Sequence, residues 1–438
     1  MMTTRPKNIL LVSFDDAVAY WPYKSCFGVP LQTPSLDRIC EQSTAFQSAY
    51  CQAPICSPSR ASFMSGQTPH ALGVHEYNSD VFAQHSPEIM WSYRLKQAGW
   101  FCSSGGKVHH GFKPLPPEVH DVLYSDERKF FRIDWRLRPD RERIKFGGRM
   151  GGAGTTNPED DKRFHDAHSA NSAIEFLDSY DSDQPFYREV GFFSPHSPWI
   201  TPVRFKRLYP AGRMTLPDAW DDDYAKTPFL KEESLENVKG RPDLWKKRTI
   251  RNYFSALSHA DYHLGRIWDA LKASQHADNT MVIIVSDHGF HLTERNRLGK
   301  STLWEQVAGV PLIVHDPDRA TPRVVRDPVG LIDVGPTVME AAGLPKLDNC
   351  VGRSLLPYMD GYTDPDRAVL TTRRDSAAMR KGRYRIIRYS DGSTQLFDLE
   401  EDWWQMRDLG SGHPAHAALL AELVATSATY GVPTSQAA

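Results

Sequence analysis

The chain has 438 residues, 40% of them hydrophobic, and a formal net charge of −2 at pH 7. This length allows one large core plus a smaller domain, and the balanced charge argues against a nucleic-acid-binding surface. The six cysteines include no Cys-x-x-Cys pair, so neither a zinc site nor a disulfide framework is indicated. No stretch approaches 18 apolar residues and the first apolar run is too short for a signal peptide, so we expect no membrane association and a cytoplasmic location.

The first predicted strand ends in two acids. Residues 9–12 form a short apolar run typical of a strand buried on both faces of a parallel sheet, and Asp15 and Asp16 follow it. Open α/β sheets bind their ligands at the carboxyl ends of the strands, where these two side chains are expected. Solvated loop acids are the simpler interpretation, but a metal cation would relieve the repulsion between adjacent carboxylates. Asp15 and Asp16 are therefore candidate metal ligands.

A helix start further along the chain carries a cysteine. In Cys56-Ser57-Pro58-Ser59-Arg60, we expect Ser57 to cap the helix and Pro58 to occupy its first position. Cys56 would then face the positive end of the helix, where free N–H groups attract anions. The charge of Arg60 opposes the helix dipole in the first turn, so Arg60 is expected to serve an anion or to hold a modified Cys56. The alternative is a buried thiol beside a turn.

The next predicted strand, residues 100–103, is followed by a glycine-rich loop with basic side chains. This loop, residues 105–111, contains Lys107, His109 and His110. Ordinary surface positions would also explain these three residues, and either histidine could be the functional one.

Two later strands also end in side chains that suit a site. The strand predicted at residues 185–193 leads to His196, whose backbone is restricted by a proline on either side. The apolar run 281–285 leads to Asp287 and His288, which repeats the layout of the first strand. Two such strand ends facing one another would provide the oxygen ligands, with one added imidazole, that suit a hard divalent cation.

The remaining segments predict one long helix and a small C-terminal region. Residues 250–271 have the apolar spacing of an amphipathic helix, and we expect its apolar stripe to be core and nothing more. Short strands and a final helix near the C-terminus predict a small antiparallel sheet with a helix. These strands and this helix are expected at residues 368–372, 384–389, 395–399 and 415–430. The expected domains are residues 1–365, catalytic α/β, and residues 366–438, a small α+β subdomain.

Taken in order, these segments resemble the type I sulfatases, the formylglycine-dependent enzymes of the alkaline-phosphatase-like superfamily. Cys56 to Arg60 match the C-x-P-x-R pattern, whose cysteine is oxidised to formylglycine in that family. The paired aspartates and the Asp287-His288 pair are similar to the iduronate-2-sulfatase-like branch. The resemblance implies an α/β fold with a large, mostly parallel sheet flanked by helices, and a smaller C-terminal antiparallel sheet plus helix.

The resemblance also implies a site and a reaction. A hydrated aldehyde at position 56 would attack the sulfur, His196 would protonate the leaving alcohol, and His110 would act as base in the release of sulfate, with His109 as the alternative. The implied catalytic residues are Cys56, Arg60, Lys107, His110, His196 and Lys300, of which Lys107, His196 and Lys300 would bind the sulfate group. The implied ligands of calcium, or of magnesium, are Asp15, Asp16, Cys56, Asp287 and His288.

The expected activity is hydrolysis of a small-molecule or saccharide sulfate ester to an alcohol and inorganic sulfate, after maturation by a formylglycine-generating enzyme. A phosphonate monoester or phosphodiester hydrolase of the same superfamily is the alternative, and a non-catalytic binding protein would be expected to have lost one of the residues above. Neither a nucleic acid nor a membrane is an expected partner. The pocket walls, expected from residues 70–85, 112–160 and 199–248, match no specific alcohol. One departure from the family is Leu292-Thr293-Glu294-Arg295, where relatives usually carry Leu-Gly-Glu-His.

Overall fold

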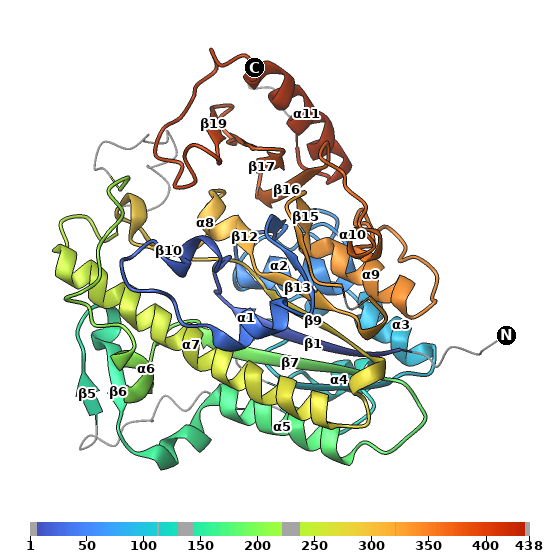
Figure 1. Ribbon diagram of the computed structural model, residues 1–438. Coiled ribbons are helices and arrows are strands. Elements are labelled where there is room, and N and C mark those ends of the chain that lie inside the picture. The colour runs from blue at the N-terminus through green and yellow to red at the C-terminus, as the bar shows by residue number, and fades with distance from the viewer. Residues whose placement is uncertain are drawn as a thin grey trace.

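The computed structural model describes residues 7–111, 114–129, 131, 143–220, 237–319 and 321–433. Within these residues a seven-stranded, mostly parallel sheet lies at the centre of the chain (Figure 1). In order across the sheet, its strands are β14, Arg323–Val325; β2, Thr44–Phe46; β13, Leu312–His315; β9, Thr280–Ser286; β1, Asn8–Asp15; β7, Phe186–Pro195; and β4, Phe101–Gly106. The last four run parallel to one another, whereas β13 is antiparallel to both of its neighbours.

Helices cover both faces of this sheet (Figure 1). One face carries α1, Pro34–Cys40; α5, His165–Ser179; and α7, Asp243–Ala273. The opposite face carries α2, Cys56–Ser65; α3, Trp91–Gln97; and α9, Val334–Ala341. This is the flanked α/β sheet that the sequence predicts.

The side chains of β1 explain why both faces must be covered. Leu10, Val12 and Phe14 point into the core under α7, whereas Ile9 and Leu11 point into the core on the opposite face. Every residue of β1 is buried, as in a strand at the centre of a parallel sheet.

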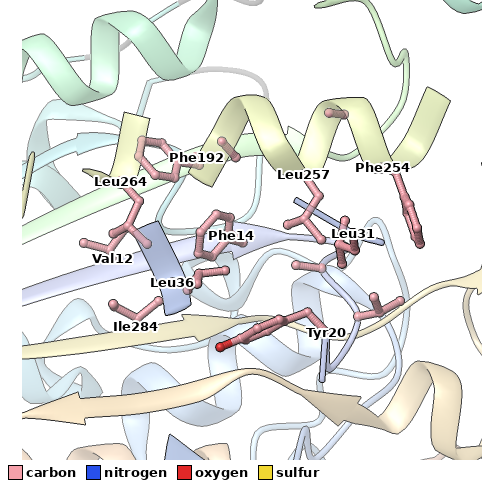
Figure 2. Packing of buried hydrophobic residues seen from close by; sticks show 14 of the residues in the cluster. Val12, Phe14, Tyr20, Leu31, Leu36, Phe192, Phe254, Leu257, Leu264 and Ile284 are labelled. Atoms are coloured by element: carbon pink, nitrogen blue, oxygen red, sulfur yellow. The ribbon is translucent and has the colours of Figure 1, made fainter. Parts of the chain in front are cut away.

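The long helix α7 packs directly on the middle of the sheet. Figure 2 shows Leu257 and Leu264 of α7 above Val12 and Phe14 of β1. The ring of Phe14 also meets the ring of Phe192 edge to face, with their centroids 5.5 Å apart. The predicted apolar stripe of this helix is therefore core.

The predicted cap of α2 is wrong. The helix begins at Cys56, its N-cap is the extended residue Ile55, and no side chain caps it. Ser57 lies inside the first turn, and its hydroxyl instead donates to the carbonyl oxygen of Ser79. Ser57 therefore ties the helix start to the loop that follows the helix.

The C-terminal region forms the small antiparallel sheet with a helix that the sequence predicts. Within the described residues its strands are β16, Ala368–Arg373; β17, Ser376–Lys381; β18, Tyr384–Arg388; and β19, Thr394–Asp398, followed by the helix α11, His416–Thr429. Strand β17 was not predicted, because its sequence lacks an apolar alternation. The hairpin turn at Asp391 and Gly392 is present, and Gly392 has a φ of 83°, which suits glycine. The domain boundary between residues 365 and 366 stays a prediction.

Smaller elements complete the described chain. The short strands are β3, Ala49–Tyr50; β5, Arg143–Lys145; β6, Ala153–Thr155; β8, Thr201–Pro202; β10, His291–Leu292; β11, Leu298–Gly299; β12, Gly309–Val310; and β15, Val329–Gly330. The short helices are α4, Pro117–Leu123; α6, Val203–Arg207; α8, Glu305–Ala308; and α10, Leu356–Met359. Parts of the predicted pocket walls, residues 112–113, 130, 132–142 and 221–236, lie outside the described residues. Among the helices that the structure describes, none has the length and apolarity needed to cross a membrane.

Candidate active site

Four adjacent parallel strands deliver the predicted site residues to one edge of the sheet. Strand β1 ends at Asp15, next to Asp16, and the neighbouring strand β9 ends just before Asp287. On the other side of β1, strand β7 leads to His196, and beyond it β4 leads to Lys107. Because all four carboxyl ends lie at the same edge, residues from distant parts of the sequence meet there.

Cys56 lies at the centre of this group, at the first residue of α2. Its Sγ is 2.9 Å from Nζ of Lys300, 3.1 Å from Nε2 of His288 and 3.6 Å from Oδ1 of Asp15. The side chain is fully buried, and this burial raises the pKa of the Cys56 thiol, although the charge of Lys300 opposes the shift. The unmodified thiol is therefore protonated at neutral pH and is a poor nucleophile.

Arg60 neutralises one carboxylate of the group. Its Nε donates to Oδ2 of Asp287 at 2.9 Å, and its other nitrogens donate to the carbonyl oxygens of Phe14, Lys107 and Val108 at 3.1, 2.9 and 2.7 Å. The side chain is only 1% exposed. The anion that Arg60 serves is thus a carboxylate of the protein, and the guanidinium joins the ends of β1, β4 and β9 to α2.

Two lysines neutralise the other two carboxylates. Nζ of Lys107 contacts Oδ2 of Asp15, and Nζ of Lys300 donates to Oδ1 of Asp16 at 2.7 Å. Burial alone would raise the pKa of Asp15, but the charges of Lys107, His196 and Arg60 hold it well below its ordinary value. Burial acts likewise on Asp16, and Lys300 is the main cause of its lowered pKa. Both carboxylates are therefore ionised.

The donor set fits a hard divalent cation. One ligand atom from each of Asp15, Cys56, Asp287 and His288 lies within 4.8 Å of the others, and Asp15, Asp16, Cys56 and His196 form a second, overlapping group. Nδ1 of His288 hydrogen-bonds the carbonyl oxygen of Gly289 at 2.9 Å, so the ring carries its proton there. Burial lowers the pKa of His288, which keeps Nε2 neutral and able to bind a metal.

The loop of His196 is held by buried partners. Asp166 accepts hydrogen bonds from the backbone N–H of Phe193 and Ser194 at 2.6 and 3.1 Å, and Nε1 of Trp199 donates to the carbonyl oxygen of Pro195 at 2.6 Å. Nδ1 of His196 lies 2.7 Å from the carbonyl oxygen of Ser197, so its Nε2 faces the site, 3.9 Å from Oδ2 of Asp16. No sequence pattern indicated Asp166, which lies on α5, well before His196 in the chain.

The two neighbouring histidines have different surroundings. Nε2 of His109 lies 3.0 Å from the hydroxyl of Tyr124. The ring of His110 instead meets the ring of Tyr77, with 4.7 Å between centroids. Burial lowers the pKa of His110 to about 3, and the charges of Lys107 and Arg60 add to this shift. Burial lowers the pKa of His109 to about 3 as well, and the charge of Arg60 adds to this shift, so the choice of His110 over His109 stays a prediction.

Two tyrosines belong to the site although the sequence did not indicate them. The hydroxyl of Tyr253 donates to the carbonyl oxygen of Asp16 at 2.6 Å and accepts from the N–H of Val18 at 2.9 Å. Tyr253 lies on α7 outside the predicted apolar stripe, so this helix contributes to the site as well as to the core. Tyr77 is half-buried, with Nζ of Lys300 6.0 Å from its ring centroid. Tyr77 lies alone in a loop and Tyr253 lies within an amphipathic helix, so neither residue stands in a pattern from which its role could be predicted.

Residues 292–295, where the sequence departs from the family pattern, belong to the segment that leads to Lys300. Thr293 and Arg295 both have left-handed backbones, with φ of 92° and 53°. The guanidinium of Arg295 lies 4.3 Å from the ring centroid of Trp304, and Arg297 donates to the carbonyl oxygen of Lys300 at 2.6 Å. The unusual residues thus shape the loop behind the lysine and do not enter the group around Cys56.

Comparison with known proteins agrees with this geometry. The sulfatase family profile matches residues 7–344. The chain is 29% identical to a sulfatase of Formosa agariphila over 423 residues, with 90% of this chain and 81% of the relative covered. It is 28% identical to the choline-sulfatase of Rhizobium meliloti over 450 residues, with 93% and 83% covered. It is 27% identical to the human iduronate 2-sulfatase over 389 residues, with 82% and 64% covered.

Solved structures share the fold over almost the whole chain. The phosphonate monoester hydrolase of Agrobacterium radiobacter superposes with a TM-score of 0.77 at 18% identity, covering 97% of this chain and 96% of the other. A protein solved with its substrate D-glucosamine-2-N,6-O-disulfate superposes with a TM-score of 0.75 at 19% identity, covering 97% and 98%. The fold is therefore alkaline-phosphatase-like. With its profile match and its sulfatase relatives, the chain belongs to the sulfatase family and is a sulfuric ester hydrolase.

Proposed function

We propose that this protein hydrolyses a sulfate ester through a formylglycine formed from Cys56, with one divalent cation, calcium or alternatively magnesium, bound by Asp15, Asp16, Asp287 and His288. The observation that carries this proposal is the position of Cys56. Its sulfur is buried and lies close to Oδ1 of Asp15, Nζ of Lys300 and Nε2 of His288. A side chain so placed can meet both a metal and a sulfate group.

The protonation of Cys56 supports modification of this residue. Burial raises the pKa of the thiol, so the unmodified residue would be a weak nucleophile at neutral pH. A formylglycine at this position would supply a hydrated aldehyde, with one hydroxyl to take up the sulfuryl group and a second to release it. Because the Cys56 side chain is fully buried, a formylglycine-generating enzyme has to reach it before this part of the chain folds.

The balance of charge supports a divalent cation. Three buried carboxylates already face Arg60, Lys107 and Lys300. A bound dication would add positive charge that the negative sulfate ester and an ionised nucleophile would offset. Such a cation would lower the pKa of a hydroxyl group bound to it and would stabilise negative charge. Cys56 belongs to both candidate ligand groups, so its modified form is also a proposed ligand.

We assign the remaining catalytic roles to the side chains around Cys56. Lys107 and Lys300 are charges fixed in place before the substrate binds, the arrangement that stabilises a transition state best. To His196, whose Nε2 faces the site, we assign the donation of a proton to the leaving oxygen. To His110, whose ring meets that of Tyr77 beside the site, we assign the role of base when sulfate is released. Arg60 acts by holding Asp287 in place.

The proposed substrate is a small-molecule or saccharide sulfate ester. Relatives named choline-sulfatase and iduronate 2-sulfatase, and the neighbour solved with a sulfated glucosamine, support this class. A phosphonate monoester hydrolase with the same fold keeps phosphonate or phosphodiester hydrolysis as the second candidate. We place the protein in the cytoplasm, since none of its six cysteines, all of which the structure describes, forms a disulfide, as is usual in a reducing compartment.

The test is an assay of protein produced together with a formylglycine-generating enzyme and loaded with calcium. Peptide mass mapping should show a loss of about 18 Da at position 56, the difference between CH₂SH and CHO. A panel of sulfate esters, phosphonate monoesters and phosphodiesters should then be turned over with sulfate esters preferred. Cys56→Ala is the matched inactive control. Full activity with an unmodified thiol, or a preference for phosphonates, would contradict the proposal.

A further inference from the structure

A small hollow adjoins the active site. It is lined by residues of the loop 104–111 and of the segment 114–129, and Lys107 and His110 belong to both the hollow and the site. Its volume is about 50 Å³. Since one water needs about 10–15 Å³ on this measure, the hollow has room for several waters or for one oxyanion of the size of sulfate.

The charged side chains that line this hollow, among the described residues, are all positive. Among the described residues that line it, three are lysine or arginine, three are histidine and none carries a carboxylate, although the chain as a whole has a net charge of −2. The six are Lys107, His109, His110, His120, Arg128 and Lys129. A surface of this composition attracts anions.

Not all six of these residues contribute equally. The ammonium groups of Lys107 and Lys129 are paired with Asp15 and Asp126. Within the described part of the chain, Arg128 has no carboxylate within 4.0 Å, and its one protein hydrogen bond there goes to the carbonyl oxygen of Leu115 at 2.7 Å. Among the residues that the structure describes, the guanidinium of Arg128 therefore keeps donors for a ligand.

His120 gives independent evidence for a ligand. Its side chain is only 6% exposed, and Nδ1 lies 3.3 Å from Oδ1 of Asp121. The buried Nε2 has no hydrogen-bond partner among the residues that the structure describes. Buried polar atoms are seldom left without a partner. An oxyanion in the hollow would supply the partner that Nε2 lacks.

We propose that this hollow is a second anion subsite, which binds a sulfate-type oxyanion through Arg128 and His120 while the Cys56 site holds the reacting ester. The proposal rests on the function proposed above, because the subsite then serves the same reaction. Its ligand is either a second anionic group of the substrate or the sulfate that the reaction frees.

Crystals of the matured, calcium-loaded protein soaked in selenate would test the subsite directly, because selenium locates each anion by anomalous scattering. We expect one peak at the Cys56 group and a second beside Arg128 and His120. A peak at the Cys56 group without one in the hollow would overturn the subsite and leave the proposed function standing. No peak at the Cys56 group, together with no hydrolysis of any sulfate ester, would instead contradict the proposed function.

Two kinetic measurements on Arg128→Ala then identify the source of the anion. In the first, D-glucosamine-6-O-sulfate and D-glucosamine-2-N,6-O-disulfate compete with 4-nitrophenyl sulfate. If the subsite holds a substrate group, the preference for the disulfate should fall about tenfold, the loss expected for one charge-assisted hydrogen bond.

In the second, the inhibition constant of inorganic sulfate is measured, and it should rise about tenfold if the subsite holds freed sulfate. His120→Phe, which keeps the ring beside Tyr124, should act in the same direction. Arg94→Ala, an exposed arginine paired with Asp348, is the matched control and should change neither value. A selenate peak with no change in either measurement would mean an adventitious ion only and would also overturn the proposal.

Discussion

Thr293→Gly is expected to stabilise the protein. Thr293 has a φ of 92°, which is unfavourable for a β-branched residue and suits glycine. Its buried Oγ1 also has no hydrogen-bond partner among the described residues. Its backbone N–H donates to the carbonyl oxygen of Arg297 at 2.9 Å, a bond that any substitution except proline keeps.

Two favourable and two unfavourable terms set the size of the effect. Relief of the left-handed backbone, which is most unfavourable for a β-branched residue, should stabilise by about 2–3 kcal/mol, and removal of the buried unpaired hydroxyl by about 1 kcal/mol. The greater freedom of glycine in the unfolded chain costs about 0.5–1 kcal/mol, and loss of the two buried side-chain carbons costs about 1.6 kcal/mol. The net expectation for Thr293→Gly is a gain of about 1 kcal/mol in the free energy of unfolding.

Thr293→Ala separates the two favourable terms. Alanine loses the hydroxyl and the methyl group but keeps the left-handed backbone, so its stability should stay close to that of the natural protein. Urea unfolding of the three proteins, followed by fluorescence and circular dichroism, measures the order. If the glycine variant is no more stable than the alanine variant, the backbone at Thr293 is not strained and the reasoning fails.

Four further predictions concern the site and its supports. Lys300→Ala should lower kcat and kcat/KM together by about 10²–10³, because the charge acts mainly in the transition state; a rise in KM alone would assign it to ground-state binding. His196→Ala should lose more activity on alkyl sulfates than on activated aryl sulfates, and equal losses would exclude a proton-donating role. Metal analysis should find one calcium or magnesium ion per chain, lost in Asp287→Ala; two zinc ions would contradict the ligand set. Burial raises the pKa of Glu189 to about 7, so the folded chain binds this proton more tightly than the unfolded chain and stability should fall between about pH 4.5 and 7. In unfolding measurements at pH 5 and 8, Glu189→Gln should reduce this loss by up to about 3 kcal/mol, whereas an unchanged loss would mean that Glu189 does not carry it.

The sequence by itself determined the strands that carry the site and the chemistry at their ends. Apolar runs such as residues 9–12 and 281–285 predict buried strands because side-chain burial follows local pattern. The acids after these runs and the pattern around Cys56 are also local features, so the candidate ligands and the nucleophile position could be identified before any contact was known. The helix 250–271 and the turn at Gly392 were predictable for the same reason.

The tertiary structure alone decided which groups meet. No local pattern shows that β9, β1, β7 and β4 are neighbours, and this order is what brings Asp287 and Lys107 to opposite sides of Asp15. Arg60 could be recognised as an unusual cation in a first helical turn, but its partner, Asp287, is 227 residues away. The hydroxyl of Tyr253 reaches the site from a helix whose spacing predicts core, since one face of a helix can bury apolar groups and still direct a polar tip to a strand end. Which residues pair across hundreds of positions depends on how the layers of the fold pack together. That packing leaves no local pattern in a single sequence.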